Sequence, residues 1–283
     1  MNKDSLFVFL QYLIPQHALS RLVGWFASSE IDFIKSTFIT KFAKKYGINM
    51  QEAKEEDLSK YKSFNDFFTR ELKDGARPIA DGEGTLVSPA DGAVSQLGKI
   101  KLGSVFQAKG RDFSVTELLG GDSDRAATFL NGDFSTIYLS PKDYHRVHMP
   151  CAGKLLETIY VPGDLFSVNP ATAQGVDGLF ARNERLVCMF ETEYGPMAMV
   201  LVGAMIVAGI ETVWSGQVCP LPKKAQVQDY TKSEIRLGKG EEMGRFKLGS
   251  TVVLCFPENA VSFLDTIKSE SPLVMGEALA EKA

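Results

Sequence analysis

The strongest constraint on the fold is a run without a single charged side chain, from Met197 to Ile210. The run is too short to cross a membrane as a helix, which takes about 20 apolar residues. Gly203, Gly209 and the high content of β-branched residues favour strands over one helix. The run therefore predicts buried strands.

Short β-rich runs, separated by glycine and proline, continue this pattern from about Leu86 onward. They cover residues 136–140, 153–161, 185–192, 197–213 and 251–256. Residues 223–244 are polar and rich in lysine, glutamate and glycine, which is typical of an exposed loop.

The amino-terminal part has helical periodicity instead. Apolar side chains recur at helical spacing up to Pro15, from Leu19 to Phe26, and on to Gly47, and Ser63 is a capping residue for a further short helix. The sequence thus predicts an α+β fold, with a mostly antiparallel, sandwich-like β core and helices gathered at the N-terminus. We expect a helical region over residues 1–75 and a β-rich domain over residues 76–283.

Charge is distributed unevenly along the chain. The net charge of −4 gives no case for nucleic-acid binding, yet residues 1–50 carry six basic and three acidic side chains. Residues 1–45 can be an interfacial membrane anchor, with aromatic rings in the lipid and lysines at the head groups. They can equally be a helical cap on the protein or a dimer contact. The first fourteen residues, apolar nearly all round, favour the anchor.

Four cysteines, widely spaced, indicate reduced and mostly buried thiols in a cytoplasmic protein: Cys151, Cys188, Cys219 and Cys255. The amino terminus has no features of a secretory signal, and no stretch is long enough to span a bilayer.

Two of the three histidines, His145 and His148, lie in one short segment after a predicted strand. Histidine is the side chain best suited to proton transfer near neutral pH. Three interpretations stay open. The pair can bind a metal, although the further ligands of a zinc site do not follow it. It can be a structural pair beside Arg146, or it can supply acid–base catalysts.

Asp91 and Ser250 are the other candidate groups. Asp91 lies in an Asp-Gly turn, and is either a plain turn residue or an aspartate that orients a histidine to activate Ser250. Gly249 leaves its carbonyl open to attack by the Ser250 hydroxyl, although Gly-Ser is also an ordinary turn pair. No Gly-x-Ser-x-Gly sequence surrounds Ser250, which argues against an α/β-hydrolase.

Six motifs together resemble the phosphatidylserine decarboxylase family of pyruvoyl-dependent membrane enzymes, and most of all its bacterial proenzymes. Each motif alone is only suggestive, but six in the right order over nearly the whole chain are highly specific. They are residues 64–70 (FNDFFTR), 89–92 (PADG), 144–150 (YHRVHMP), 160–169 (YVPGDLFSVN), 180–185 (FARNER) and 248–251 (LGST).

The resemblance implies a chain that cuts its own backbone between Gly249 and Ser250. Asp91, His148 and Ser250 would form the self-processing triad, in which His148 takes the Ser250 proton and Asp91 holds the histidine tautomer. The products would be a β chain of residues 1–249 and an α chain of residues 250–283. Ser250 would become a pyruvoyl group that forms a Schiff base with the substrate amine and draws electrons as carbon dioxide leaves. His145 would protonate the resulting carbanion to give phosphatidylethanolamine.

The resemblance also implies partners and a location. They are phosphatidylserine and anionic membrane lipid, the α and β chains from one precursor, and a homodimer, with no metal ion and no nucleic acid. A lipid substrate favours the anchor interpretation of residues 1–45 and a peripheral place on the cytoplasmic face of the inner (cell) membrane. Two other functions remain as alternatives: a metal-dependent hydrolase that uses His145, His148 and Asp91, and a non-catalytic lipid-binding protein.

Overall fold

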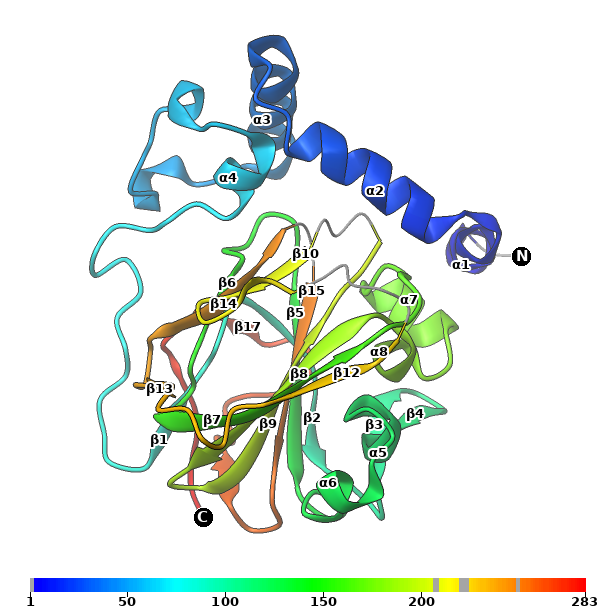
Figure 1. Cartoon of the computed structure of the whole chain (residues 1–283), viewed down its shortest axis with the longest axis vertical. Helices are drawn as coiled ribbons and strands as arrows, with labels where there is room; N and C mark the ends of the chain where they lie inside the picture. The colour runs from blue at the N-terminus through cyan, green and yellow to red at the C-terminus, as the bar shows by residue number, and fades with distance from the viewer. Residues whose placement is uncertain (1–2, 206–208, 219–223, 248–249) are drawn as a thin grey trace.

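Helices form the amino-terminal part of the chain and lie together beyond one end of the β strands (Figure 1). The computed structural model describes residues 3–205, 209–218, 224–247 and 250–283. The first helices, with two 3-10 turns between the last two, are α1 (Lys3–Leu13), α2 (Gln16–Ala27), α3 (Asp32–Tyr46), η1 (Met50–Glu52), η2 (Leu58–Lys60) and α4 (Phe64–Phe68).

The ends of these helices follow the residues that the sequence marks as helix ends. Helix α1 stops two residues before Pro15. Helix α3 ends at Gly47, whose φ of 62° is the left-handed conformation that glycine adopts at a C-cap. The Ser63 side chain accepts a hydrogen bond from the Asp66 N–H and so caps α4. The helical prediction for this part of the chain is confirmed.

One large antiparallel sheet forms the centre of the molecule. Within the described residues it has nine strands, in the order β12 (Gln226–Asp229), β7 (Gly153–Val161), β8 (Arg185–Thr192), β9 (Gly195–Val202), β15 (Ser250–Phe256), β5 (Asp133–Leu139), β2 (Gly92–Lys99) and β17 (Pro272–Leu273), with β13 (Arg236–Leu237) also on β7. Strand β15 therefore lies in the interior of the sheet, between β9 and β5.

Two smaller sheets cover one face of the large sheet and give the core its sandwich-like form. They are β11 (Gly216–Gln217), β10 (Gly209–Thr212), β14 (Glu242–Lys247) and β6 (Arg146–His148), and β1 (Thr85–Val87), β18 (Ala278–Lys282) and β16 (Val261–Phe263). Side chains of β15 alternate between the faces. Val252 and Leu254 enter the apolar core on this face, and Val253 and Cys255 enter a second core on the other.

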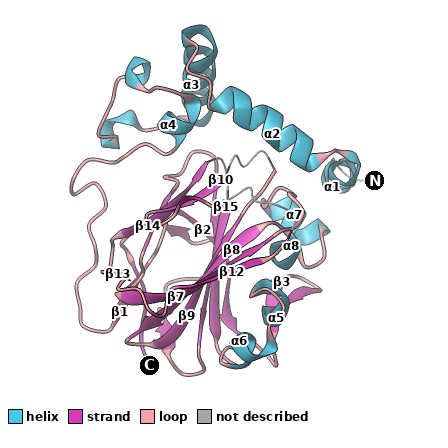
Figure 2. Cartoon of the chain, in the orientation of Figure 1, coloured by secondary structure: helices cyan, strands magenta, loops and turns pink. Residues whose placement is uncertain are grey.

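The second face is covered by a β ribbon and by short helices that the sequence pattern did not predict (Figure 2). These elements are β3 (Ser104–Ala108), β4 (Arg111–Ser114), α5 (Val115–Leu118), α6 (Ser123–Ala127), α7 (Pro170–Gly175) and α8 (Leu179–Arg182). Helices this short do not complete two turns, so they leave no periodic stripe in the sequence.

The uncharged run divides between β9 and β10, which belong to different sheets. Its prediction as buried strands is confirmed for the described residues. The prediction of a loop for residues 223–244 is wrong in part, because β12, β13 and the start of β14 lie there. Strand β12 is exposed throughout and pairs with β7 through its main chain. An edge strand of this kind needs no apolar alternation.

The cysteines behave as predicted where they are described. Cys151, Cys188 and Cys255 are buried and free, and Cys219 lies outside the described residues. Burial raises the pKa of Cys151 to about 12, which keeps the thiol protonated and unreactive.

Candidate active site

Two connections between the same pair of sheets bring the candidate residues together. Strand β5 leads through residues 140–145 to β6, and β14 leads through residues 248–249 to β15. Strands β5 and β15 pair in the large sheet, with Ser250 opposite Leu139, and β6 and β14 pair in the four-stranded sheet. The N–H of Phe246 donates to the His145 carbonyl at 3.0 Å. The segment that carries His145 and His148 and strand β14, which leads to Ser250, therefore lie side by side.

Ser250 is the first residue of β15 and is fully buried. Its Oγ has no hydrogen-bond partner among the residues that the structure describes. Ser135, Thr136 and Thr251 also have buried hydroxyls without a partner in the described ranges, so what distinguishes Ser250 is its place at the start of β15. Gly249, the other residue of the predicted cleavage site, lies outside the described residues.

His148 ends β6, and its ring is held at both nitrogens. Nδ1 lies 2.8 Å from the Gly240 carbonyl, and Nε2 lies 3.1 Å from the Tyr144 hydroxyl. A carbonyl only accepts, so Nδ1 carries the proton and Nε2 is the basic atom. Burial lowers the pKa of His148, against the opposing effects of Gly240, Glu242 and Asp91. The ring is thus a neutral base with a fixed tautomer.

Asp91 lies in the turn between β1 and β2, close to His148 in the fold, since the His148 N–H donates to Pro89 O at 2.8 Å. Its carboxylate, however, accepts hydrogen bonds from the Arg77 guanidinium and the Met275 N–H. His148 Nδ1 donates instead to the Gly240 carbonyl. The arrangement makes Asp91 a fixed negative charge near the histidine.

Gly92 is required beside Asp91 by a close approach of two strands. A Cβ at this position would lie 2.3 Å from the Tyr138 carbonyl oxygen of β5. The Asp-Gly pair of the turn therefore has a steric reason.

His145 is fully buried under α4, and its ring centroid lies 4.0 Å from that of Phe68. Nδ1 lies 2.8 Å from the Asp143 carbonyl, and Nε2 has no partner in the described part of the chain. Burial lowers the pKa of His145 to about 3, so the ring is neutral at physiological pH. Its role as a proton donor stays a prediction.

We expect the buried neutral ring of His145 to weaken the fold in acid. The folded pKa of about 3 lies below the ordinary value of 6.5, so the unfolded chain binds more protons between these values. Stability is then lost as pH falls below 6.5, by about 3 kcal/mol at pH 4.5 from this group alone. Urea unfolding of the uncut Ser250→Ala protein at a series of pH values measures the effect.

His145→Asn is the matched control, since its side-chain amide can still donate to Asp143 but does not titrate. Its free energy of unfolding should vary less between pH 6.5 and 4.5, by about 2 kcal/mol, because half of the unfolded wild-type histidine is already protonated at pH 6.5. Equal pH dependence of the two proteins would contradict the assignment of a low pKa to His145.

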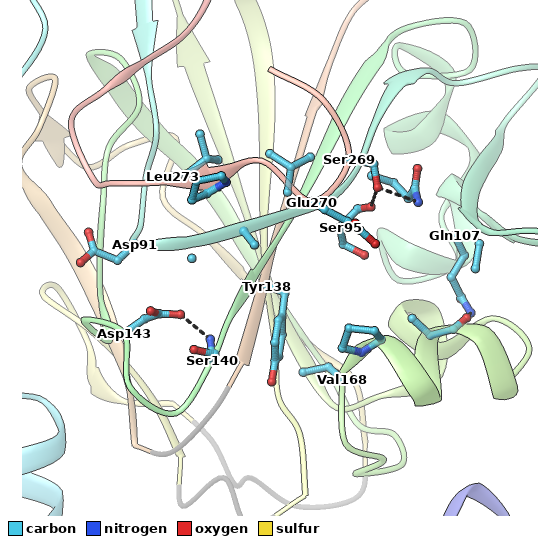
Figure 3. Close-up of a pocket in the computed structure, with 18 of the residues that line it drawn as sticks. Asp91, Ser95, Gln107, Tyr138, Ser140, Asp143, Val168, Ser269, Glu270 and Leu273 are labelled. Carbon is cyan, nitrogen blue, oxygen red and sulfur yellow. Dashed lines mark hydrogen bonds between the residues drawn. The ribbon is translucent and has the colours of Figure 1, made fainter. Parts of the chain in front are cut away.

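A cavity of about 620 Å³ is lined by Asp91, Ser140 and Asp143, whereas His145, His148 and Ser250 are not among its described lining residues. Figure 3 shows Asp91, Asp143 and Ser140 toward one end of the cavity and Gln107 toward the other. The Ser140 N–H donates to the Asp143 carboxylate at 2.7 Å. Ser140 follows Leu139, the strand partner of Ser250, so the cavity reaches the neighbourhood of the predicted cleavage site.

The sequence did not predict several residues that contact the candidate groups, among them Arg77, Tyr144, Gly240 and Met275. Tyr144 had a signal, since it belongs to the same motif as both histidines. Arg77 and Gly240 come from irregular segments far away in the chain, and no local pattern indicates their contacts.

Comparisons with known proteins give the same family as the six motifs. The family model described as phosphatidylserine decarboxylase matches residues 64–281, and a second, described as PSD, matches residues 6–47. The phosphatidylserine decarboxylase proenzyme of Alcanivorax borkumensis is 64% identical over 95% of this chain and 93% of that protein. The proenzyme of Saccharophagus degradans is 59% identical over 99% of this chain and 98% of that protein. That of Hahella chejuensis is 57% identical over 98% and 93%. The chain therefore belongs to the phosphatidylserine decarboxylase family.

Proposed function

We propose that this chain decarboxylates phosphatidylserine to phosphatidylethanolamine at a membrane surface, after cutting its own backbone between Gly249 and Ser250. Family membership supports the carboxy-lyase activity and the substrate. The observation that carries the self-cleavage is the place of the Ser250 hydroxyl, which is buried where β15 begins, opposite Leu139 and so beside the strand end that leads to His145 and His148.

His148 is the base that we assign to the cleavage. The proton of Ser250 Oγ passes to Nε2, directly or through the Tyr144 hydroxyl that lies 3.1 Å from it. Oγ then forms an ester bond to the Gly249 carbonyl carbon as the peptide C–N bond breaks, and the proton goes to the freed nitrogen. The Gly240 carbonyl holds the tautomer of His148, and the charge of Asp91 stabilises the imidazolium.

A proton then leaves Cα of residue 250 as its Cβ–Oγ bond breaks. This elimination leaves a carboxylate on Gly249, which ends the β chain, and a carbon–carbon double bond in residue 250, which rearranges to an imine as Cβ takes up a proton. Water then replaces the backbone nitrogen on Cα of residue 250, and this nitrogen leaves as ammonia. The α chain therefore begins with a pyruvoyl group. That group supplies a conjugated carbonyl, which takes up the electron pair left behind by carbon dioxide.

The substrate head group fits the cavity beside Asp91 and Ser140. Its volume of about 620 Å³ is within the usual range for ligand sites, about 300–1,000 Å³. Lys142 lines it and can pair with an anionic group of the substrate. Because β15 fixes residue 250 opposite Leu139, the reactive end of the α chain stays next to this cavity.

Residues 1–75 are the part that we propose to associate with the membrane, with residues 76–283 as the catalytic domain. Helices α1 to α3 and their connections expose a set of large apolar side chains: Leu6, Phe7, Phe9, Leu10, Tyr12, Leu13, Ile14, Leu22, Trp25, Ile31, Phe33 and Phe38. Together with the basic excess of residues 1–50, they suit a peripheral place on the cytoplasmic face of the cell membrane. None of the helices in the described ranges is long and apolar enough to cross a bilayer.

We expect replacement of Trp25 and Phe33 by serine to weaken vesicle binding by more than tenfold. These side chains are 63% and 80% exposed, and burial of one large apolar side chain contributes about 1.5–3 kcal/mol. Co-sedimentation with vesicles that contain phosphatidylserine measures the partition. Leu102→Ser is the control, because Leu102 is 90% exposed but lies outside the helices. A double variant that binds as well as the control would remove the anchor role of these residues.

The mass of the carboxyl-terminal fragment tests the proposed function directly. Purified protein should give two chains, and the α chain should weigh less than a fragment beginning with an unmodified serine by the mass of one ammonia. Vesicles of phosphatidylserine should yield phosphatidylethanolamine with the same preparation. A fully active protein that remains one intact chain would rule the self-cleavage out.

A further inference from the structure

Arg77 makes the most extensive contact to any of the candidate site residues. It lies in the segment between α4 and β1, and only 13% of its side chain is exposed. Its Nε lies 2.9 and 3.1 Å from the two Asp91 carboxylate oxygens, and Nη2 lies 2.6 Å from Oδ2. This is a two-point ion pair, the geometry that best fixes a carboxylate in orientation as well as in position.

Further contacts hold both partners of this ion pair. Nη2 of Arg77 also donates to the Glu52 carboxylate at 2.9 Å, and Nη1 donates to the Ala76 carbonyl at 2.8 Å. On the other side, the Met275 N–H donates to Asp91 Oδ1 at 2.8 Å. Asp91 is therefore held between a cation from the segment that follows the helices and a main-chain donor near the carboxyl terminus.

The surroundings of Asp91 make this cation important. The carboxylate is largely buried and acts electrostatically on another buried acid, Asp143, whose pKa is raised by burial and further by Asp91. Without the Arg77 cation, the negative charges of Asp91 and Asp143 repel each other with less positive charge beside Asp91 to offset them. The titratable and charged groups that interact with Asp91 or with its ion pair are Glu52, Arg70, Arg77, Asp143, Tyr144 and His148.

We propose that Arg77 is a positioning residue for self-cleavage, which holds the Asp91 carboxylate in place near His148 through the two-point ion pair, with Glu52 as its own support. The inference rests on the proposed role of Asp91 in the cleavage. It assigns a part in processing to the segment between the helical region and the β core.

The test follows cleavage of freshly translated full-length chains on a denaturing gel, at a series of pH values. Arg77→Ala should cleave at least tenfold more slowly at neutral pH. Its rate should also reach its plateau at a higher pH than the wild-type rate, because the neighbouring carboxylates of Asp91 and Asp143 have then lost the cation that offsets their charge. A purely structural defect does not move the pH profile. Added guanidinium ion, at a concentration too low to unfold the protein, should restore part of the rate.

Matched variants separate the possible failures. Arg125→Ala removes a similarly buried ion pair, to Glu157 at 2.7 Å, on the second face of the large sheet, and should cleave normally. Glu52→Gln should slow cleavage severalfold. Arg77→Lys keeps the charge without the two-point geometry, so its cleavage rate should lie between the rates of Arg77→Ala and the wild type. If Arg77→Ala fails to fold, Arg77→Lys should still cleave more slowly than the wild type.

The inference is overturned if Arg77→Ala or Arg77→Lys cleaves at the wild-type rate with the wild-type pH profile. Faster cleavage would also overturn it, since Arg77 would then restrain Asp91. If Asp91→Asn itself cleaves normally, the proposed role of Asp91 in cleavage is wrong. This outcome is distinguishable from a failure of the Arg77 inference alone, in which Asp91→Asn cleaves slowly and the Arg77 variants cleave normally.

Discussion

Ser250→Ala is expected to give a single uncut chain without decarboxylase activity. The variant lacks the oxygen that attacks the Gly249 carbonyl and then leaves in the elimination, so the chain stays uncut and residue 250 cannot become the ketone that serves as the electron sink. The fold should persist, because the Ser250 hydroxyl makes no hydrogen bond among the described residues whose loss would destabilise the protein. A denaturing gel and release of carbon dioxide from labelled phosphatidylserine measure the two losses.

Thr251→Val is the matched control for this experiment. Thr251 is the next residue of β15, is also fully buried, and has an Oγ1 without a partner in the described ranges. Valine removes this hydroxyl at almost constant shape. Thr251→Val should cleave its backbone and decarboxylate phosphatidylserine. If Ser250→Ala still yields two chains, another group attacks the backbone.

His148→Ala is expected to slow cleavage by about 10²–10⁴-fold, the usual contribution of a general base. Ser250 then has to lose its proton without the His148 Nε2 atom. His145 is the other neutral ring whose Nδ1 is held by a carbonyl, that of Asp143, but it lies fully buried against Phe68 of α4. A time course of chain cleavage after translation measures the rate. The melting temperature of the uncut chain shows whether the fold has survived.

His17→Ala serves as the control for loss of a histidine. His17 lies on α2, and its Nε2 contacts the Gly163 carbonyl at 3.0 Å, away from the cluster around Ser250. Its replacement should leave cleavage unchanged. If His148→Ala cuts as fast as His17→Ala, the base has to be sought elsewhere in the site.

The fold could be predicted where the residues of an element determine it locally. Ser63 and Gly47 mark helix ends by their own chemistry, and the uncharged run marks strands that are buried on both faces. Strand β12 could not be predicted, because an exposed edge strand pairs through main-chain groups that are the same in every residue.

The candidate site divides in the same way. Asp91, His145, His148 and Ser250 are residue types with their own chemistry in short motifs, so the sequence pointed to them. Their partners could not be predicted, since Arg77, Gly240 and Met275 reach the site only through tertiary structure. The expected Asp91–His148 bond illustrates the difference. The two residues lie close together, but Arg77 holds the carboxylate and Gly240 holds the ring.

The interior position of β15 has a consequence for a chain that is cut just before it. Both sheet neighbours of β15 precede the cut, and β16, β17 and β18 pair with one another or with strands from the first 249 residues. The two products would resemble complementary fragments of one protein rather than two subunits with an interface. They should melt in a single cooperative transition and stay together during native gel filtration, because separation would expose both apolar cores. The scission would thus change the covalent structure at one strand end and leave the folding unit whole.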